Sequence, residues 1–359
     1  MSALKTAEAV SPLTEIVKTC PLCKSEGAEK MFPVRDRLHG LPGEFALVRC
    51  GNCSLVRLSP RPVPESLSYY YPEAEYYSYQ TPTASIQTLS PRAQLRGLRN
   101  TIRNLVLHSL EYPVPPPTGW QRALQPLLVS LFRTRALYGM PRRFPRYRPG
   151  GRALDIGCGN GAYLSYLKHH GWQVAGVDIS AEAAATAKRE FDIDVFAGQL
   201  QDAPFEPASF DFIHMSHVIE HVPDPLEVLY LTARLLKPGG HLYIETPNVD
   251  SAGCRQCGRY WFPWESPRHL FLFSPDTLRQ ILCKAEFAIL DMQTIFFQQL
   301  YHWEATYQLE ERRQSRLSPR PQLRLVSRPR AILLWSAARF ECLLHPLNGD
   351  ILCCWATKK

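Results

Sequence analysis

Residues Leu154–Gly161 read LDIGCGNG, and this stretch decides how the rest of the chain is interpreted. It closes an apolar run that favours a strand and opens a segment with helical periodicity. Glycines at 157, 159 and 161 permit a tight turn and let backbone N–H groups approach a ligand at the positive end of the helix. A strand, a glycine turn and a helix form the opening unit of a doubly wound α/β fold.

The chain after Arg152 alternates between short β-branched runs and helical stretches, which is typical of a parallel sheet with crossover helices. We therefore expect a doubly wound, Rossmann-like α/β domain. Helices are expected to start near Gly161, Ala181, Pro225 and Ser274. Strands are expected near Arg152–Gly157, Gln173–Ile179, Val195–Gly198, Phe210–Ser216, His241–Thr246, Ile289–Phe296 and, after an arginine-rich helical stretch, Asp350–Thr357.

Two carboxylates near the glycines bear on the choice of cofactor. Asp178 ends the second expected strand, where it can accept both hydroxyls of a ribose. Asp155 lies two residues before Gly157, where it attracts an ammonium group and repels a pyrophosphate. Gly157, Gly159 and Ala162 also satisfy the looser dinucleotide pattern, so NAD stays open, but Asp155 favours S-adenosylmethionine.

Four motifs in this order resemble those of the class I S-adenosylmethionine-dependent methyltransferases: LDIGCGNG, GVDIS, Gly198–Pro225 and LKPGGHLYIETPN. The resemblance covers Arg152 to Leu290 and implies a seven-stranded sheet with an antiparallel last strand. By position, it also implies cofactor contacts from Asp155, Gly157, Gly159, Asn160, Gly161, Asp178, Ile179, Gln199 and Leu200. The family usually has an acid where Gln199 stands, so an amide contact with the adenine is expected here.

Candidate catalytic residues follow the fourth expected strand. Methyl transfer is an in-line displacement, so the protein supplies alignment and, for a hydroxyl or an acidic carbon, a base. His221, His217 and Glu220 lie in SHVIEHVPDP, with a hydrogen-bonding structural role as the alternative. This stretch also resembles the ubiquinone-pathway O-methyltransferases, where a divalent metal is held and an acid stands at the place of His217.

A later aromatic stretch, WFPWESPRHLFLFS (Trp261–Ser274), adds further candidates. His269 is a second candidate base. Trp261 and Arg268 are candidate substrate-binding residues, because aromatic rings and guanidinium groups suit a sugar face or a phosphate. The alternative is a loop packed into a core.

Paired cysteines near the start predict a metal module. CPLC (Cys20–Cys23) and CGNC (Cys50–Cys53) offer the four thiolates Cys20, Cys23, Cys50 and Cys53, enough to hold a structural, tetrahedral Zn²⁺. We expect a hairpin around Arg35–Phe45 between them. With the tyrosine-rich segment that follows, the layout resembles bacterial sugar and surface-polysaccharide methyltransferases that carry an N-terminal zinc domain. That resemblance implies a small-molecule acceptor that contains a sugar and is linked to a nucleotide or a lipid, methylated at oxygen or carbon.

The expected organisation has five parts. These are a zinc-binding module (1–66), a proline- and arginine-rich helical connector (67–149), a methyltransferase core (150–298), a helical insertion (299–349) and a closing strand (350–359). In the connector, Leu95, Leu98, Ile102 and Leu105 recur at helical spacing, and a second helix is expected over Trp120–Tyr138.

Charge and cysteine content limit the alternative functions and locations of the protein. The formal net charge is +8, but Thr88–Arg148 alone carries +10, with eleven arginines and one acid. An RNA methyltransferase that grips nucleic acid with the zinc module and this connector is therefore the alternative function, and a non-catalytic adaptor is a further one. Because no signal peptide or long apolar segment is evident, we expect a cytoplasmic protein with reduced thiols. Peripheral contact with the inner face of the membrane through the arginine and leucine faces is an additional hypothesis.

Overall fold

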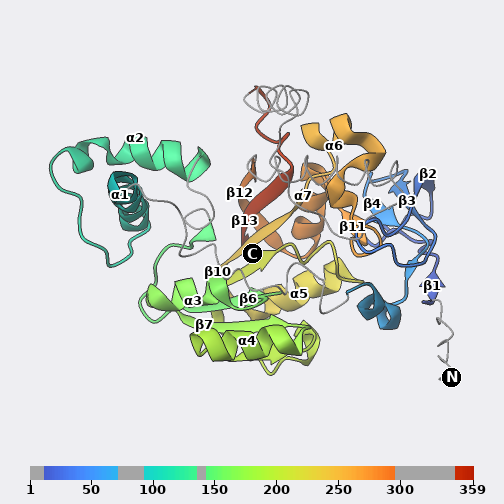
Figure 1. Ribbon diagram of the computed structural model, residues 1–359, viewed down its shortest axis with the longest axis horizontal. Coiled ribbons are helices and arrows are strands. Elements are labelled where there is room, and N and C mark those ends of the chain that lie inside the picture. Colours follow the sequence, from blue (N-terminus) through green and yellow to red (C-terminus); the bar gives the residue numbers. More distant parts are fainter. Residues whose placement is uncertain (1–11, 72–92, 136–142, 296–343) are drawn as a thin grey trace, which may run out of the picture.

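The computed structural model describes residues 12–71, 93–135, 143–295 and 344–359. Its main sheet has seven strands in the order β12-β13-β10-β9-β6-β7-β8 (Figure 1). The strands are β6 (Arg152–Ile156), β7 (Gln173–Asp178), β8 (Val195–Ala197), β9 (Phe210–Ser216), β10 (Leu236–Pro247), β12 (Phe287–Ile295) and β13 (Ile351–Lys358). β13 lies antiparallel between β10 and β12. The doubly wound fold and the antiparallel last strand are both confirmed.

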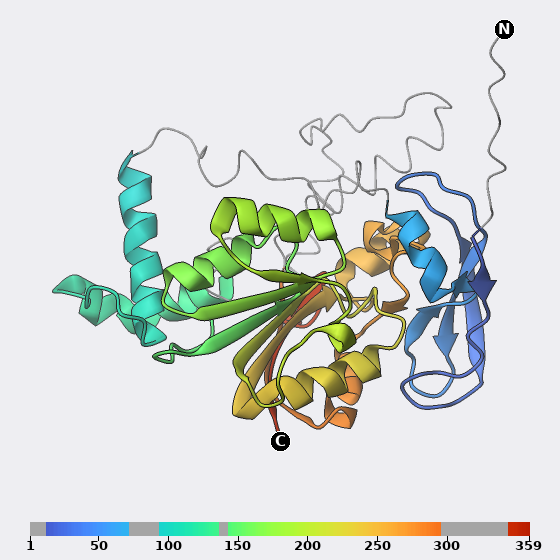
Figure 2. The same cartoon turned by 90° about the horizontal axis from the view of Figure 1, so that it is seen from below.

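Helices cover both faces of this sheet, as Figure 2 shows. α3 (Ala162–His169) and α4 (Ala181–Phe191) lie on one face, and α5 (Pro225–Leu235) and α7 (Pro275–Lys284) lie on the other. Local sequence fixes their starts: Ser180 caps α4, Asp224 caps α5, and Ser274 forms a capping box with Thr277 on α7. All four helices begin within one residue of the expected position.

The core follows from the alternation along each strand. Leu154, Ile213 and Ile244 point into the larger apolar cluster, whereas their neighbours Ala153, Phe212 and Tyr243 join a second cluster on the other face. Buried polar residues interrupt the second face at one place, where Asp155, His214 and Glu245 lie on adjacent strands. This polar stripe ends beneath the glycine turn.

The N-terminal residues form a smaller sheet with the order β11-β4-β3-β2. β2 (Ala28–Val34) and β3 (Phe45–Cys50) pair around the expected hairpin loop, and β4 (Val56–Leu58) follows. β11 (Phe271–Leu272) comes from the core region and pairs with β4, so the two parts of the chain share a sheet. β1 (Thr14–Glu15) pairs with β5 (Arg61–Pro62), and a 3-10 helix, η1 (Pro64–Tyr70), follows.

The connector forms α1 (Ala93–Ser109) and α2 (Trp120–Arg135), at the opposite end of the molecule from the N-terminal sheet (Figures 1 and 2). α6 (Ala252–Cys257) lies between β10 and β11 in the chain. The expected helical insertion lies largely outside the described residues, as does the expected end of α2. Among the described residues, no helix is long and apolar enough to cross a bilayer.

Candidate active site

The glycine turn after β6 needs glycine for both space and backbone conformation. Gly157 has a φ of +69°, and a Cβ there would lie 2.4 Å from Cγ2 of Val218. Gly161 has a φ of +77°, and its Cβ would lie 2.8 Å from Cβ of Ala187. A side chain at either position would therefore strain the backbone and clash with Val218 or with Ala187.

Asp178 closes this turn from the end of β7. Its Oδ2 accepts the N–H of Gly159 at 2.8 Å, and its Oδ1 accepts the N–H of Ser180 at 2.9 Å. The side chain is largely buried, and burial raises its pKa above the ordinary value. Each carboxylate oxygen has a second lone pair, so the group can still accept the hydroxyls of a ribose.

The remaining predicted cofactor residues lie around the same sheet edge. Asn160 Oδ1 accepts the N–H of Ala162 within the turn. Ile179 follows Asp178 and is 65% exposed, which leaves an apolar surface open beside the expected ribose site. Gln199 and Leu200 follow β8, and the Gln199 amide oxygen accepts from the Gln201 amide at 2.5 Å. Contact of these residues with an adenosine stays a prediction.

Asp155 is enclosed, which its position in the sequence did not reveal. It is 3% exposed, and its Oδ1 lies 2.6 Å from Nδ1 of His214 on β9. The Tyr163 ring packs on His214 with centroids 4.1 Å apart. The direct attraction between Asp155 and an ammonium group stays a prediction, and His214 is the partner that sequence reasoning missed.

A buried polar network holds the residues just past β9. His217 has a φ of +56°, and its Nδ1 lies 3.2 Å from Oε1 of Glu220. The other Glu220 oxygen accepts from the Thr246 hydroxyl at 2.9 Å. Burial acts to raise the pKa of Glu220, but the hydrogen bond and charge of His217 outweigh it and lower that pKa to about 2. Glu220 is therefore an ionised, fully buried carboxylate.

His221 and His269 face each other across this carboxylate, with ring centroids 4.6 Å apart. Nδ1 of His221 lies 3.2 Å from the Arg268 carbonyl oxygen, and Nδ1 of His269 lies 2.7 Å from the Pro263 carbonyl oxygen. A carbonyl only accepts, so we assign the proton of each ring to Nδ1 and the lone pair to Nε2. Burial lowers the pKa of both histidines to about 4, which keeps both neutral at pH 7.

The same residues form a donor set for a cation. Glu220, His221 and His269 each offer a ligand atom, and these atoms lie within 4.8 Å of one another. One carboxylate and two neutral imidazoles whose N–H groups contact carbonyls are ligands that a divalent transition metal accepts. The arrangement can therefore serve as a base or hold such an ion.

The family comparison is consistent with this geometry. Residues 131–291 match a family model described as a methyltransferase domain. The order of the seven strands agrees with the class I arrangement expected from the motifs. The described residues of this range therefore have the Rossmann-like α/β fold of a methyltransferase domain.

The alignments between this chain and its curated relatives cover only part of each relative. A ubiquinone biosynthesis O-methyltransferase of Xanthomonas campestris pv. campestris is 36% identical over 110 residues, 29% of this chain and 46% of the relative. That of Idiomarina loihiensis is 35% identical over 106 residues, 28% of this chain and 43% of the relative. The chain thus spans less than half the length of these curated relatives.

Solved structures align with the chain at low TM-scores. The [4+2]-cyclase SpnF aligns with a TM-score of 0.43 and 20% identity, over 76% of this chain and 97% of its own. Phosphoethanolamine N-methyltransferase 2 of Haemonchus contortus aligns with a TM-score of 0.42 and 21% identity, over 76% of this chain and 60% of its own. The assignment rests on the family model and the strand order.

Arg268 joins the methyltransferase domain to the N-terminal module. Its guanidinium is fully buried and donates to Asp36 Oδ1 at 2.8 Å, to the Tyr70 carbonyl at 3.1 Å and to Glu265 Oε1 at 3.3 Å. These contacts do not favour the predicted direct contact between Arg268 and an acceptor. Arg268 instead places its own carbonyl oxygen against His221.

Tyr71 is a second residue that sequence reasoning missed. It follows η1 in the N-terminal part of the chain, and its hydroxyl lies 2.9 Å from Nδ1 of His221. The tyrosine cluster was visible in the sequence, but nothing in it pointed to a contact across 150 positions. The N-terminal module therefore reaches the candidate base of the methyltransferase domain directly.

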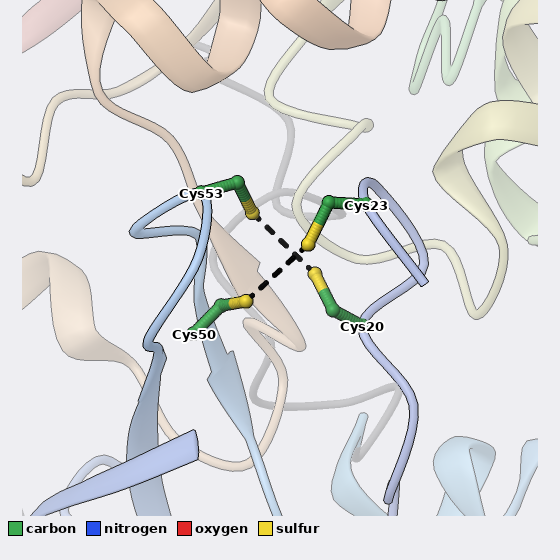
Figure 3. Close-up of side chains that lie close together, drawn as sticks. All are labelled: Cys20, Cys23, Cys50 and Cys53. Carbon is green, nitrogen blue, oxygen red and sulfur yellow. Dashed lines mark hydrogen bonds between the residues drawn. The ribbon is translucent and has the colours of Figure 1, made fainter. Parts of the chain in front are cut away.

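The four predicted metal cysteines converge, as Figure 3 shows. Sγ of Cys20 lies 3.6 Å from Sγ of Cys53, and Sγ of Cys23 lies 3.5 Å from Sγ of Cys50. Tetrahedral zinc with Zn–S bonds of about 2.3 Å needs sulfur–sulfur distances of about 3.8 Å. The donor set and its spacing both fit zinc.

Proposed function

We propose that this chain transfers a methyl group from S-adenosylmethionine to a small sugar-containing acceptor linked to a nucleotide or a lipid, at oxygen or carbon. The observation that carries the proposal is the glycine turn after β6, closed by the Asp178 carboxylate through the Gly159 N–H. The cofactor would supply an electrophilic methyl on a sulfonium, and the turn with Asp178 would hold its adenosine part.

The protein's own chemical contribution is proton removal and alignment. His221 is the preferred base, because its neutral state and its assigned Nε2 lone pair suit proton abstraction from a hydroxyl or an acidic carbon. His269, 4.6 Å away between ring centroids, is the second candidate. Glu220 orients His217 and, by its negative charge, favours a transient imidazolium on His221. If a divalent cation occupies these residues, chelator-treated enzyme loses activity and recovers it with added metal.

Two observations support a small acceptor. The curated relatives are named as ubiquinone biosynthesis O-methyltransferases, which supports O-methylation of a small molecule. The segment around Trp261 lies beside the N-terminal module and next to His269. Its indole Nε1 has no acceptor among the described residues, and Arg259 is exposed, so these two groups suit a sugar phosphate. Structural zinc on Cys20, Cys23, Cys50 and Cys53 is part of the same proposal.

An acceptor screen tests the proposal. Purified protein would be incubated with labelled S-adenosylmethionine and, in separate reactions, nucleotide sugars, lipid-linked glycans, and transfer or ribosomal RNA. We expect label in a sugar-containing acceptor and none in RNA, because α1 and α2 lie at the opposite end of the molecule from the N-terminal sheet (Figure 1). Label in RNA alone, with an affinity that falls steeply with salt, would replace this proposal.

Peripheral contact with the inner face of the membrane, by a cytoplasmic protein, completes the proposal. Ile102 and Leu105 of the expected apolar face are buried, but Trp120, Leu124 and Leu127 lie on one side of α2 and are 56%, 43% and 57% exposed. Flotation with anionic vesicles at low and high salt measures this contact. No flotation at either salt concentration would contradict it.

A further inference from the structure

A small cavity lies between the N-terminal module and the methyltransferase domain. The loop after β2 lines one side, and residues 258–268 line the other. Its volume is about 20 Å³, enough for one oxygen atom. Among its lining residues Glu265 is special, because its Oε2 lies 3.8 Å from Nε2 of His269. The cavity therefore adjoins the candidate catalytic residues.

The charge around this cavity is strongly positive. Arg35, Arg37, Arg259 and Arg268 line it, against the single acid Glu265. Arg268 is paired with Asp36 and Glu265, and Arg35 and Arg259 bring further guanidinium groups to the rim. Arg37 donates to the Arg259 carbonyl at 3.0 Å and lies 5.0 Å from the Tyr260 ring centroid, which fixes its position.

A buried donor in the same cavity has no acceptor. Trp261 lines it and is 2% exposed, yet its indole Nε1 makes no hydrogen bond within the described part of the chain. A buried N–H without an acceptor is unfavourable, and an oxygen atom that enters the cavity removes that cost. Water would satisfy the indole alone, but the guanidinium groups of Arg35 and Arg259 favour an oxygen that carries negative charge.

We propose that this cavity is the phosphate subsite of the acceptor, with one phosphoryl oxygen on Trp261 Nε1 and the rest of the group against Arg35 and Arg259. This inference rests on the proposed function, since it names the part of the acceptor that the enzyme grips while His221 and His269 face the reacting atom. A nucleoside diphosphate and an isoprenyl diphosphate present the same group and are the two sources to compare.

Calorimetry with inorganic diphosphate tests the subsite without any turnover. We expect binding to the wild-type protein, about tenfold weaker binding to Trp261→Phe, which keeps the ring and loses the N–H, and a similar loss in Arg259→Ala. Arg189→Ala on α4, an exposed arginine outside the cavity, is the matched control and should bind like wild type. Equal affinity in all four proteins, or no binding at millimolar diphosphate, would overturn the proposal.

A second measurement separates this inference from the proposed function. Titrations with S-adenosylmethionine should give the same affinity in wild type, Trp261→Phe and Arg259→Ala, because the cavity lies outside the glycine turn. With the identified acceptor, the variants should show a raised KM and a retained kcat. Diphosphate binding without any methyl transfer would support the subsite and contradict the proposed function. Methyl transfer with an unchanged KM in the variants would contradict the subsite alone. Competition by a nucleoside diphosphate against an isoprenyl diphosphate then identifies the source.

Discussion

The cofactor half and the acceptor half of this site are assembled differently. On the cofactor side, the glycine turn and Asp178 belong to one strand–helix–strand unit and are joined by a hydrogen bond between positions 159 and 178. On the acceptor side, Tyr71, His221 and His269 come from three separate segments. A site within one unit forms as that unit folds, whereas a site between units depends on their docking. Damage to the N-terminal module should therefore affect catalysis and spare cofactor binding.

The broadest expected effect, on metal content, melting temperature and turnover together, follows from loss of the four-thiolate site. Cys50→Ser should lose bound zinc, lower the melting temperature and reduce kcat at least about tenfold, because structural zinc supports folding of small modules. The S-adenosylmethionine affinity should stay within about twofold of wild type, since the glycine turn makes its contacts elsewhere. Metal analysis, thermal unfolding and calorimetry measure the three quantities. Cys283→Ser, at an exposed cysteine of α7, is the control; equal losses in both variants would contradict the assignment.

The largest effect on turnover alone is expected at the base. His221→Asn should lower kcat by about 10² to 10⁴, the contribution of a general base, and leave cofactor affinity nearly unchanged. Steady-state rates and a cofactor titration on the same sample separate the two. Full activity of this variant together with full activity of His269→Asn would show that neither histidine is the base.

A change in the cofactor half should show the opposite pattern. Asp178→Asn keeps the shape but loses the charge, so S-adenosylmethionine should bind about 10 to 100 times more weakly. The fold should persist, as circular dichroism can verify. Asp194→Asn, at an exposed carboxylate after α4, is expected to bind normally. Unchanged affinity in Asp178→Asn would place the ribose elsewhere.

The acceptor half should also govern the acid sensitivity of the fold. His221 and His269 have pKa values lowered to about 4 by burial, whereas an unfolded histidine has a pKa of about 6.5. Between these values the unfolded chain binds more protons, so the free energy of unfolding should fall as the pH drops from about 6.5 to 4. Urea titrations across this range measure the slope. His269→Gln should flatten it, and an unaltered slope in that variant would argue against a neutral buried ring.

The smallest expected effect lies at the adenine. Gln199→Glu restores the acid that the family usually carries, and a carboxylate accepts an amino group more strongly than an amide does. S-adenosylmethionine affinity should rise by about two- to fivefold, measured by calorimetry at constant salt. Weaker binding in Gln199→Glu would indicate that this side chain faces away from the adenine.

The difference between the two halves also sets what the sequence can predict. The strands and helices of the core were predictable because apolar alternation and capping residues such as Ser180 and Asp224 are local signals. The four metal cysteines were predictable because each pair has the spacing of a knuckle. The positions of β6, β7 and β9 agree with expectation, while β10 starts at Leu236, earlier than expected, and its register with β9 breaks between Leu236 and His241.

Contacts between distant segments could not be predicted from one sequence. Arg268 and Asp36 are 232 positions apart, and a buried pair of this kind has no local pattern. Because β11 pairs with β4, Arg268 contacts Asp36 and Tyr70 of the N-terminal region. The aromatic and arginine content of the Trp261–Ser274 segment had suggested that Arg268 binds the acceptor. His214 was within reach of analysis, because β6 and β9 pair in parallel register with Asp155 opposite His214. That register becomes visible only when the strand order is known.

The central claim is that the glycine turn and Asp178 hold S-adenosylmethionine. Isothermal calorimetry of the purified chain with S-adenosylmethionine, its demethylated product and NAD, each titrated separately, tests it most directly. We predict saturable binding of the first two ligands at one site per chain and no binding of NAD. Binding of NAD with no uptake of either methionine-derived ligand would contradict the account.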